Sequence, residues 1–199
     1  MRKLVGLTAA CMFLAASGSS HAMKLVGFDW GVNFLKPSDS RFDAYSTAFT
    51  LEIPIQKATI GYYHESVNIK GQDSNATTVS PSYITVNALR LTFPLANLKN
   101  QTGLPIAIEG LIDIGAANIN INAVNTAGIS TSIVRTKPMG DIGFGVLYNA
   151  GSAYGVQANV GITALYRFLK VSPVALFGTG TAVDDLGGFE IGFNMLIAY

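Results

Sequence analysis

The sequence predicts an all-β protein, namely an eight-stranded antiparallel up-and-down transmembrane β-barrel. Charged residues make up only 13% of the chain, whereas hydrophobic residues make up 49%. Beyond residue 22, however, no run of 18 apolar residues could form a spanning helix. Many short segments instead alternate large apolar residues with small or polar ones, which is the period of a strand with two different faces. A closed barrel accounts for this hydrophobic chain, since it spreads the apolar residues over one face of many strands.

The N-terminal segment has the three parts of a secretory signal peptide. Arg2 and Lys3 give it a positive start, the apolar run 4–16 follows, and small residues lead to Ala22. The apolar run is shorter than the roughly 20 residues that a spanning helix needs. We therefore expect residues 1–22 to be a cleaved signal peptide and residues 23–199 to form a single barrel domain.

The composition of residues 23–199 excludes several classes of protein. Without the two basic residues of the signal segment, 11 basic residues face 12 acidic ones, which gives no indication of nucleic-acid binding. The only cysteine, Cys11, lies in the signal segment, so the remaining domain cannot form a disulfide.

The first four predicted strands each place large apolar residues on one parity. They cover residues 24–35, 43–55, 58–69 and 82–93. The residues expected to face outward are Val26, Phe28, Trp30, Val32 and Phe34 in the first, Tyr45, Phe49, Leu51 and Ile53 in the second, Ile60 and Tyr62 in the third, and Leu89, Leu91 and Phe93 in the fourth. Tyr83, Thr85 and Asn87 have the same outward parity but are more polar, so we expect that part of the fourth strand to lie above the bilayer.

The last four predicted strands repeat this alternation. They cover 106–117, a sixth strand with its clear part at 141–148, 154–168 and 189–199. We expect Pro138 to interrupt the upper part of the sixth strand, residues 118–130 to form a loop, and 149–152 to form a tight turn. Connections after the second and sixth strands are short and those after the third, fifth and seventh are long, as in barrels with periplasmic turns and extracellular loops. Two connections depart from this rule, because the first is short and the fourth is long.

The C-terminal strand carries a specific pattern, in which alternate large apolar residues end on an aromatic. Its residues are Phe193, Met195, Ile197 and Tyr199. This pattern resembles the signature that the barrel-assembly machinery reads, and the chain resembles small eight-stranded outer-membrane proteins of the OmpA, OmpX and OmpW-like class. The resemblance implies location in the outer membrane of a Gram-negative bacterium. It also implies a monomer, with outer-membrane lipids or lipopolysaccharide, the assembly machinery and periplasmic chaperones as partners. We expect the last strand to pair with the first.

Charged residues collect on the inward parity of the predicted strands. The predicted lumen charge cluster consists of Asp29, Glu52, Arg90, Glu109, Asp113, Asp141, Arg167 and Glu190, with Glu65 on the same parity and Arg135 and Lys137 joining if the sixth strand extends upward. If the fourth turn centres between Lys99 and Asn100, Arg90 lies opposite Glu109, with Glu52 nearby. An eight-stranded barrel leaves room only for side chains, so a polar plug is expected. A narrow cation-favouring path is the alternative, since acids outnumber bases there.

One cluster, His64-Glu65-Ser66, has a catalytic composition. It loosely resembles the His and Ser of the outer-membrane lipid A deacylase, but the strand parity places His64 and Ser66 outside the barrel. We therefore expect no catalytic residues, no metal site and no cofactor.

The expected function is a structural or surface-exposed, non-enzymatic outer-membrane barrel. The alternatives are a narrow pore for ions or small solutes and, third, a lipid-modifying enzyme. A soluble lipocalin-like barrel, with an apolar inside and a polar outside, is the structural rival.

Overall fold

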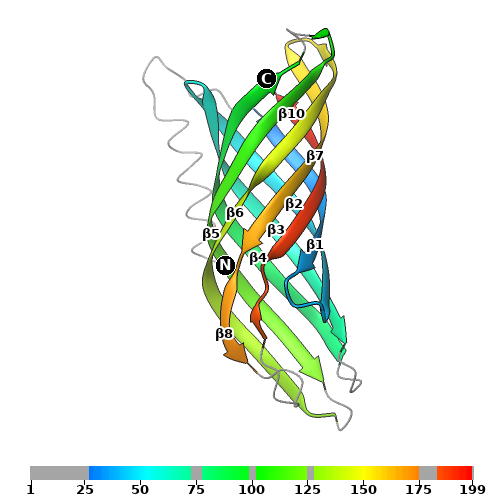
Figure 1. Ribbon diagram of the computed structural model, residues 1–199, viewed down its shortest axis with the longest axis vertical. Helices are drawn as coiled ribbons and strands as arrows, with labels where there is room; N and C mark the ends of the chain where they lie inside the picture. Colours follow the sequence, from blue (N-terminus) through cyan, green and yellow to red (C-terminus); the bar gives the residue numbers. More distant parts are fainter. Residues whose placement is uncertain (1–26, 73–77, 99–101, 125–127, 175–182, 199) are drawn as a thin grey trace.

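The computed structural model describes residues 27–72, 78–98, 102–124, 128–174 and 183–198. The predicted signal peptide, the start of the first predicted strand and Tyr199 lie outside the described residues. Eight strands form a closed barrel in the order β1-β10-β7-β6-β5-β4-β3-β2, with antiparallel neighbours throughout (Figure 1). They are β1 (Gly27–Pro37), β2 (Phe42–Ile55), β3 (Ala58–Gln72), β4 (Thr78–Asn97), β5 (Ile106–Val124), β6 (Ser130–Ala153), β7 (Val156–Phe168) and β10 (Gly188–Ala198). The predicted fold class is confirmed.

Closure depends on the pairing of the first and last strands. The β1–β10 ladder runs without interruption from the pair Gly27–Ala198 to the pair Pro37–Gly188. A closed sheet has no exposed strand edge that could pair with another chain. The expectation that the C-terminal strand pairs with the first is therefore correct.

The two ends of the barrel differ. The turn end carries the connections β2–β3, β4–β5 and β6–β7, near the chain's C-terminus at the top of Figure 1. The loop end, at the bottom, carries the other connections and a separate two-stranded sheet of β8 (Lys170–Val174) and β9 (Val183–Asp185). In outer-membrane barrels short turns face the periplasm, so we expect the loop end to face the outside of the cell.

The outer face of the barrel wall is apolar. Large hydrophobic side chains are exposed on seven of the eight barrel strands, among them Phe28, Trp30, Tyr45, Leu89, Ile114, Phe144, Ile162, Tyr166 and Phe193. On β3 the outward Ile60 and Tyr62 are partly exposed. Charged side chains such as Arg90, Asp141 and Arg167 are buried inside. This is the reverse of a soluble lipocalin-like barrel, so that alternative is wrong. Among the described residues, no helix has the length and hydropathy needed to cross a membrane.

At the loop end the strands continue well past the lengths that the sequence suggested. The β5–β6 ladder extends from the pair Ile106–Tyr148 to the pair Val124–Ser130, so the predicted loop at 118–130 is mostly strand. Pro138 does not interrupt β6. It pairs with Ala116 on β5, and it lies on the loop-end side of Gly140, where β6 is no longer paired with β7. Proline, which has no N–H, is tolerated where a strand has lost a neighbour on one side.

The interior of these extended strands is an apolar core. Its larger members include Phe42, Val67, Ile69, Ile84, Ile119 and Ile121, together with Leu169, Val171, Val183 and Leu186 from the segment around β8 and β9. All of them are almost completely buried. The β8–β9 segment thus contributes to a plug of hydrocarbon side chains at the loop end.

The turn between β6 and β7 differs from its predicted position. β6 continues through a bulge between Asn149 and Gly151 to Ala153, and the chain reverses at Tyr154 and Gly155, both with positive φ. Tyr154 therefore lies in a turn and is fully exposed, rather than forming the start of a strand. At the other end, the short β1–β2 connection is fixed by Arg41, whose guanidinium bonds to Asp39 and holds the pKa of that carboxyl below its ordinary value.

Gly143 allows β6 and β7 to approach closely. A Cβ at this position would lie 2.0 Å from the backbone oxygen of Ala164, whereas a Cβ at Gly145 would meet nothing closer than 3.5 Å. Gly143→Ala is expected to lower the free energy of unfolding by about 1–3 kcal/mol, because the strands must move apart. Gly145→Ala is the matched control and should stay within about 0.5 kcal/mol of the parent. Urea titration in detergent micelles, followed by fluorescence of Trp30, measures both; equal effects of the two variants would contradict the prediction.

Candidate functional site in the barrel lumen

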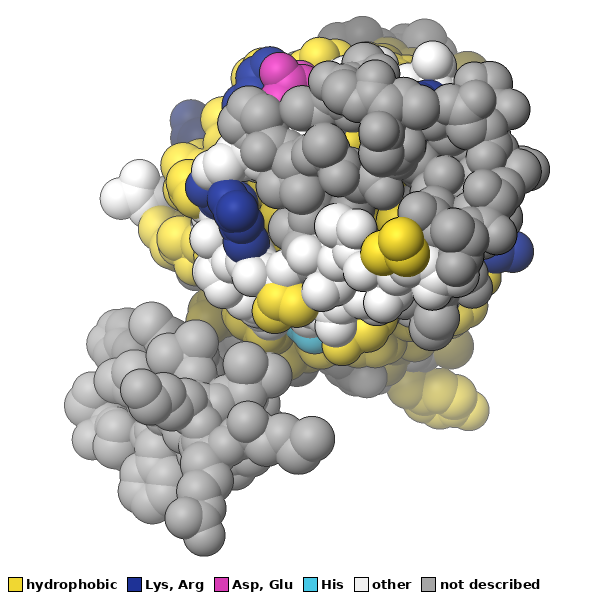
Figure 2. All heavy atoms as spheres, turned by 90° about the horizontal axis from the view of Figure 1, so that it is seen from below, with side chains coloured by type: hydrophobic (Ala, Val, Ile, Leu, Met, Phe, Trp, Pro, Cys, Tyr) yellow, Lys and Arg dark blue, Asp and Glu magenta, His cyan; other side chains and the backbone are white. Residues whose placement is uncertain are grey.

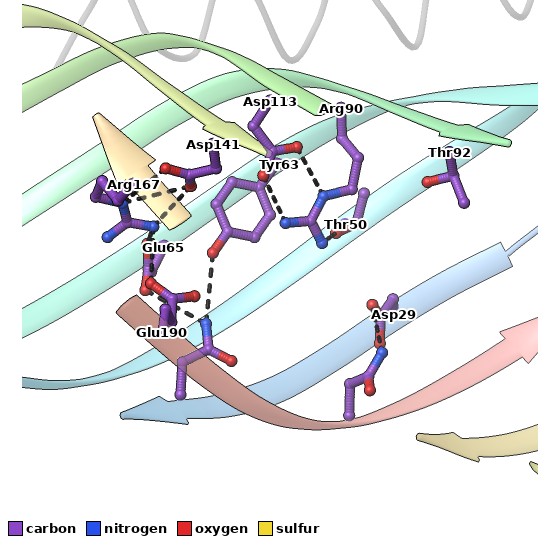
Figure 3. A network of polar contacts seen from close by, with 12 residues as sticks. Asp29, Thr50, Tyr63, Glu65, Arg90, Thr92, Asp113, Asp141, Arg167 and Glu190 are labelled. Atoms are coloured by element: carbon purple, nitrogen blue, oxygen red, sulfur yellow. Dashed lines mark hydrogen bonds and ion pairs between the residues drawn. The ribbon is translucent and has the colours of Figure 1, made fainter. Parts of the chain in front are cut away.

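The centre of the lumen holds one guanidinium surrounded by three carboxylates. Arg167 on β7 donates from Nε and Nη2 to Asp141 on β6, at 2.9–3.3 Å, and its Nη2 lies 2.6 Å from Glu65 Oε2 and 3.0 Å from Glu190 Oε2. All four side chains are essentially fully buried. Figure 3 shows them converging from β3, β6, β7 and β10. Formal charge is not balanced here, because three acids share one cation.

The three carboxylates differ in their other partners. Glu65 also accepts hydrogen bonds from the Ser46 hydroxyl and from Asn33 Nδ2. Glu190 touches Arg167, but within the described part of the chain neither of its oxygens accepts a hydrogen bond with good geometry. Glu190 is therefore the least well satisfied of the three acids.

A second guanidinium lies nearby on β4. Arg90 makes a two-pronged contact with Asp113 on β5, with Nε to Oδ1 at 2.8 Å and Nη2 to Oδ2 at 2.7 Å. Its guanidinium carbon lies 4.0 Å from the centre of the Tyr63 ring. Tyr63 lies between the two guanidinium groups in Figure 3, and its hydroxyl accepts from Asn33. The aromatic face and the paired carboxylate together compensate the buried charge of Arg90.

The expected pairing of Arg90 with Glu109 is wrong. Arg90 lies opposite Asp113, and Glu109 lies opposite Pro94, nearer the turn end. In the connection after β4, Thr102 N–H bonds to Leu98 O, and a bulge lies between Pro94 and Ala96. The register is therefore shifted by four residues, an even number that leaves every side chain on its predicted face.

Three of the predicted acids lie toward the turn end and do not contact a guanidinium group. They are Asp29, Glu52 and Glu109. Glu52 accepts a hydrogen bond from Thr92 rather than contacting Arg90, and Asp29 accepts one from Asn194. Glu52 and Glu109 line an open cavity of about 550 Å³, which we call the vestibule. Between Asp29 and Arg90 the remaining void measures only about 10 Å³, the room of about one water molecule.

Arg135 and Lys137 do not join the lumen cluster. Arg135 is exposed, and Lys137 donates to Ser172 Oγ on β8 rather than to any of the lumen acids. The lumen therefore contains seven acidic side chains and two arginines among the described residues.

Several polar residues of the cluster were not predicted. They are Asn33, Ser46, Thr50 and Tyr63, which bond to or stack on the charged groups. Their inward parity was a signal, since a neutral donor on the same face as a buried carboxylate is a natural partner for it.

The His64-Glu65-Ser66 segment does not assemble a catalytic triad. His64 faces outward, where its Nδ1 lies 3.0 Å from Asn87 Oδ1 and its ring lies 5.1 Å from that of Phe49. Glu65 points to the opposite side of the wall, onto Arg167. Ser66 has the outward parity of His64, so the acid is separated from the other two by the sheet.

Comparison with known proteins adds little at the level of sequence. No protein-family model and no curated protein matches the chain. Among solved structures, the N-terminal β-barrel domain of Pseudomonas aeruginosa OprF has 11% identity and a TM-score of 0.43, covering 88% of this chain and 98% of that one. The Yersinia pestis attachment invasion locus protein Ail, in complex with the heparin analogue sucrose octasulfate, has 15% identity and a TM-score of 0.41, covering 87% of this chain and 94% of that one. The β domain of the Bordetella autotransporter BrkA has 8% identity and a TM-score of 0.35, covering 87% of this chain and 99% of that one. Such low values carry no conclusion about activity or ligands.

The geometry of this chain defines its class. An eight-stranded closed barrel, with an apolar outer face and charged residues inside, is a small outer-membrane β-barrel protein. Its lumen is filled by two arginine-centred clusters beneath an apolar core.

Loss of the Arg167 charge should be far more damaging than loss of an exposed cation. Arg167→Met leaves three buried carboxylates without their cation and is expected to lower the free energy of unfolding by about 3–5 kcal/mol. Adding Glu65→Gln should recover part of this loss, because it removes one of the stranded charges. The control is Lys36→Met, whose partner Asp43 is largely exposed, and no measurable change is expected there. Urea midpoints of the four proteins in micelles test this; the prediction fails if Arg167→Met matches the control.

Proposed function

We propose that this protein is a non-conducting and non-enzymatic outer-membrane barrel with a structural or surface-exposed role. The observation that carries this proposal is the double closure of the lumen. The Arg167 and Arg90 clusters fill its middle, and the apolar core fills its loop end. An ion would have to displace paired charges and then cross hydrocarbon, and both steps are costly.

The loop end supports a surface role. β5 and β6 remain paired as far as Val124 and Ser130, so the barrel presents ordered sheet at the outside of the cell. Rigid elements hold exposed side chains in fixed positions, which favours contact with other surface molecules.

A lipid-modifying enzyme has less support. Hydrolysis by serine requires an adjacent histidine that is oriented by an acid. In the His64-Glu65-Ser66 segment the only acid is Glu65, and its carboxylate contacts Arg167 across the lumen.

A narrow pore remains the second candidate, because of the vestibule. Its opening at the turn end and the carboxylates of Glu52 and Glu109 would attract cations from the periplasm. The vestibule ends at the charged clusters, so conduction would require these clusters to rearrange.

Planar-bilayer recording separates the two candidates. The mature chain is expected to give no conductance steps above baseline, because the apolar core closes the lumen. The double variant Arg90→Ser/Asp113→Ser should also be silent, since it loosens only the charged layer. Cation-selective steps in the parent protein that disappear in Glu52→Gln/Glu109→Gln would contradict the proposal and favour the pore.

We also propose that the barrel-assembly machinery recognises the outward residues of β10. Phe193 and Met195 are exposed on the outer face, and Ile197 is partly exposed beside them. Tyr199, the fourth residue of the predicted signature, lies outside the described residues.

Phe193→Ala should therefore reduce the amount of folded protein in the outer membrane several-fold. The matched control is Phe144→Ala on β6, because Phe144 is 51% exposed on the same face and Phe193 is 52% exposed. Both variants lose the same ring, but only Phe193 belongs to the predicted signature. Quantitative gels of outer-membrane fractions, loaded without boiling, measure the folded form; an equal loss in both variants would argue against recognition of β10.

A further inference from the structure

The outer surface of β3–β6 changes character along the strands. Toward the turn end it exposes apolar side chains such as Leu89 and Ile114, which are 56% and 70% exposed. Toward the loop end the same faces become polar, and the charged residue next to them on β3 is the exposed Lys70, whose ammonium lies over the Tyr45 ring. Six residues define this surface, which we call the amide face: Asn68, Tyr83, Thr85, Asn118, Asn120 and Thr136.

The amide face is a continuous, ordered part of the sheet. One row of cross-strand pairs joins Thr85, Asn118 and Thr136, and the next joins Asn68, Tyr83 and Asn120. Thr136 Oγ1 donates to Asn118 Oδ1 at 2.8 Å, and Asn120 Nδ2 donates to the Tyr83 hydroxyl at 2.9 Å. These bonds orient the side chains but use only part of their capacity, because an amide offers two donor hydrogens and an acceptor oxygen.

The chemistry of the amide face suits neutral sugars. Its six residues provide amides, hydroxyls and one tyrosine ring that is 47% exposed, and none of the six is charged. The second row ends at Val134, which pairs with Asn120 and is 73% exposed, and Lys70 follows Asn68 on β3. Phosphate groups are normally recognised by arginine or lysine. Amide and hydroxyl groups beside an aromatic ring instead provide adaptable hydrogen bonds and a flat apolar contact for polyhydroxylated ligands. Seen from the loop end, Figure 2 shows Lys and Arg side chains at several places around the rim, and at one of them an acidic side chain lies beside a basic one.

The position of the amide face identifies its occupant. It continues directly from the apolar band on the same strands, so it lies where the headgroups of the surrounding outer-leaflet lipids begin. Above Asn118, β5 continues for six residues to Val124, roughly 20 Å of strand. That length exceeds the thickness of a simple phospholipid headgroup and matches a lipid that carries several sugars.

We propose that the amide face binds the core oligosaccharide of lipopolysaccharide molecules in the same membrane. Donors and acceptors of Asn118, Asn120 and Thr85 bond to sugar hydroxyls, and the Tyr83 ring packs on a sugar face. This inference rests on the outer-membrane location in the proposed function, but it is independent of whether the lumen conducts.

The test compares two membranes that differ only in their sugars. The mature chain is folded into bilayers containing either lipid A alone or lipopolysaccharide with its core oligosaccharide. The temperature at which the band shifts on an unboiled gel gives the unfolding midpoint. Binding to the folded state should raise this midpoint by about 5 °C in the presence of the core sugars.

Variants connect this difference to the amide face. Thr85→Val/Asn118→Leu/Asn120→Leu should abolish the difference between the two membranes, and Asn118→Ala alone should reduce it if the triple variant fails to fold. The matched control is Asn149→Leu/Asn159→Leu. These two asparagines form a cross-strand pair at the vestibule, where Asn149 Nδ2 donates to Asn159 Oδ1 at 3.1 Å. This variant should keep the full difference in midpoint between the two membranes.

Three results would overturn the proposal. The parent protein could have equal midpoints in the two membranes, or the amide-face variants could keep the full difference. Free core oligosaccharide, added to the lipid A membrane, could stabilise the protein as well as the anchored form does, which would indicate a soluble glycan as the ligand. None of these results depends on conductance, so a failure here is distinguishable from a failure of the non-conducting role.

Discussion

The ion pair between Arg167 and Glu65 spans the width of the barrel. β7 and β3 lie on opposite sides of the eight-stranded ring, and their side chains meet at 2.6 Å. Through these two residues the cluster also reaches Asn33 on β1, Ser46 on β2, Asp141 on β6 and Glu190 on β10. An eight-stranded ring is just wide enough for its side chains to touch across it. A buried charge there has almost no water, so its partners must come from the facing strands, and this requirement fixes how the strands stand relative to one another.

The lumen contains two kinds of interior with different energetic roles. For the charged pairs in the middle, the cost of removing both partners from water offsets much of their Coulombic attraction. These pairs therefore add little net stability, although breaking one of them is costly. The apolar core has no such penalty and gains about 25 cal/mol for each Å² removed from water. Side chains such as Ile84, Ile119 and Leu186 therefore contribute more to stability, whereas the arginine clusters penalise any arrangement of strands that leaves a charge unpaired.

The sequence predicted faces better than it predicted partners. A period of two determines which side of the wall a residue takes, and for that reason Arg90, Asp113, Arg167 and Glu190 were all placed inside. Partners depend on register, which is set by turns and bulges. Between β4 and β5 the bulge at Pro94–Ala96 changes the register, so Arg90 faces Asp113 instead of the predicted Glu109. The extension of β5 was missed because Asn and Ala are weak strand signals, although the buried Ile119 and Ile121 within Asn118–Ala123 already had the period of a strand.

The position of the membrane boundary follows from an inversion along single strands. On β5, Ile114 faces out and Asp113 faces in, whereas a few residues further on Asn118 faces out and Ile119 faces in. β4 makes the same change between Leu89 and Thr85, and Thr85 pairs directly with Asn118. Hydrocarbon outside requires apolar side chains there, and polar surroundings require the opposite arrangement, with apolar residues packed inside. Because neighbouring strands invert at the same row of pairs, this row marks the level at which hydrocarbon gives way to headgroups. Above this row the outer face of the wall is polar, as the amide face, and its inner face is apolar, as the core. Both follow from the replacement of hydrocarbon by a polar environment outside the barrel.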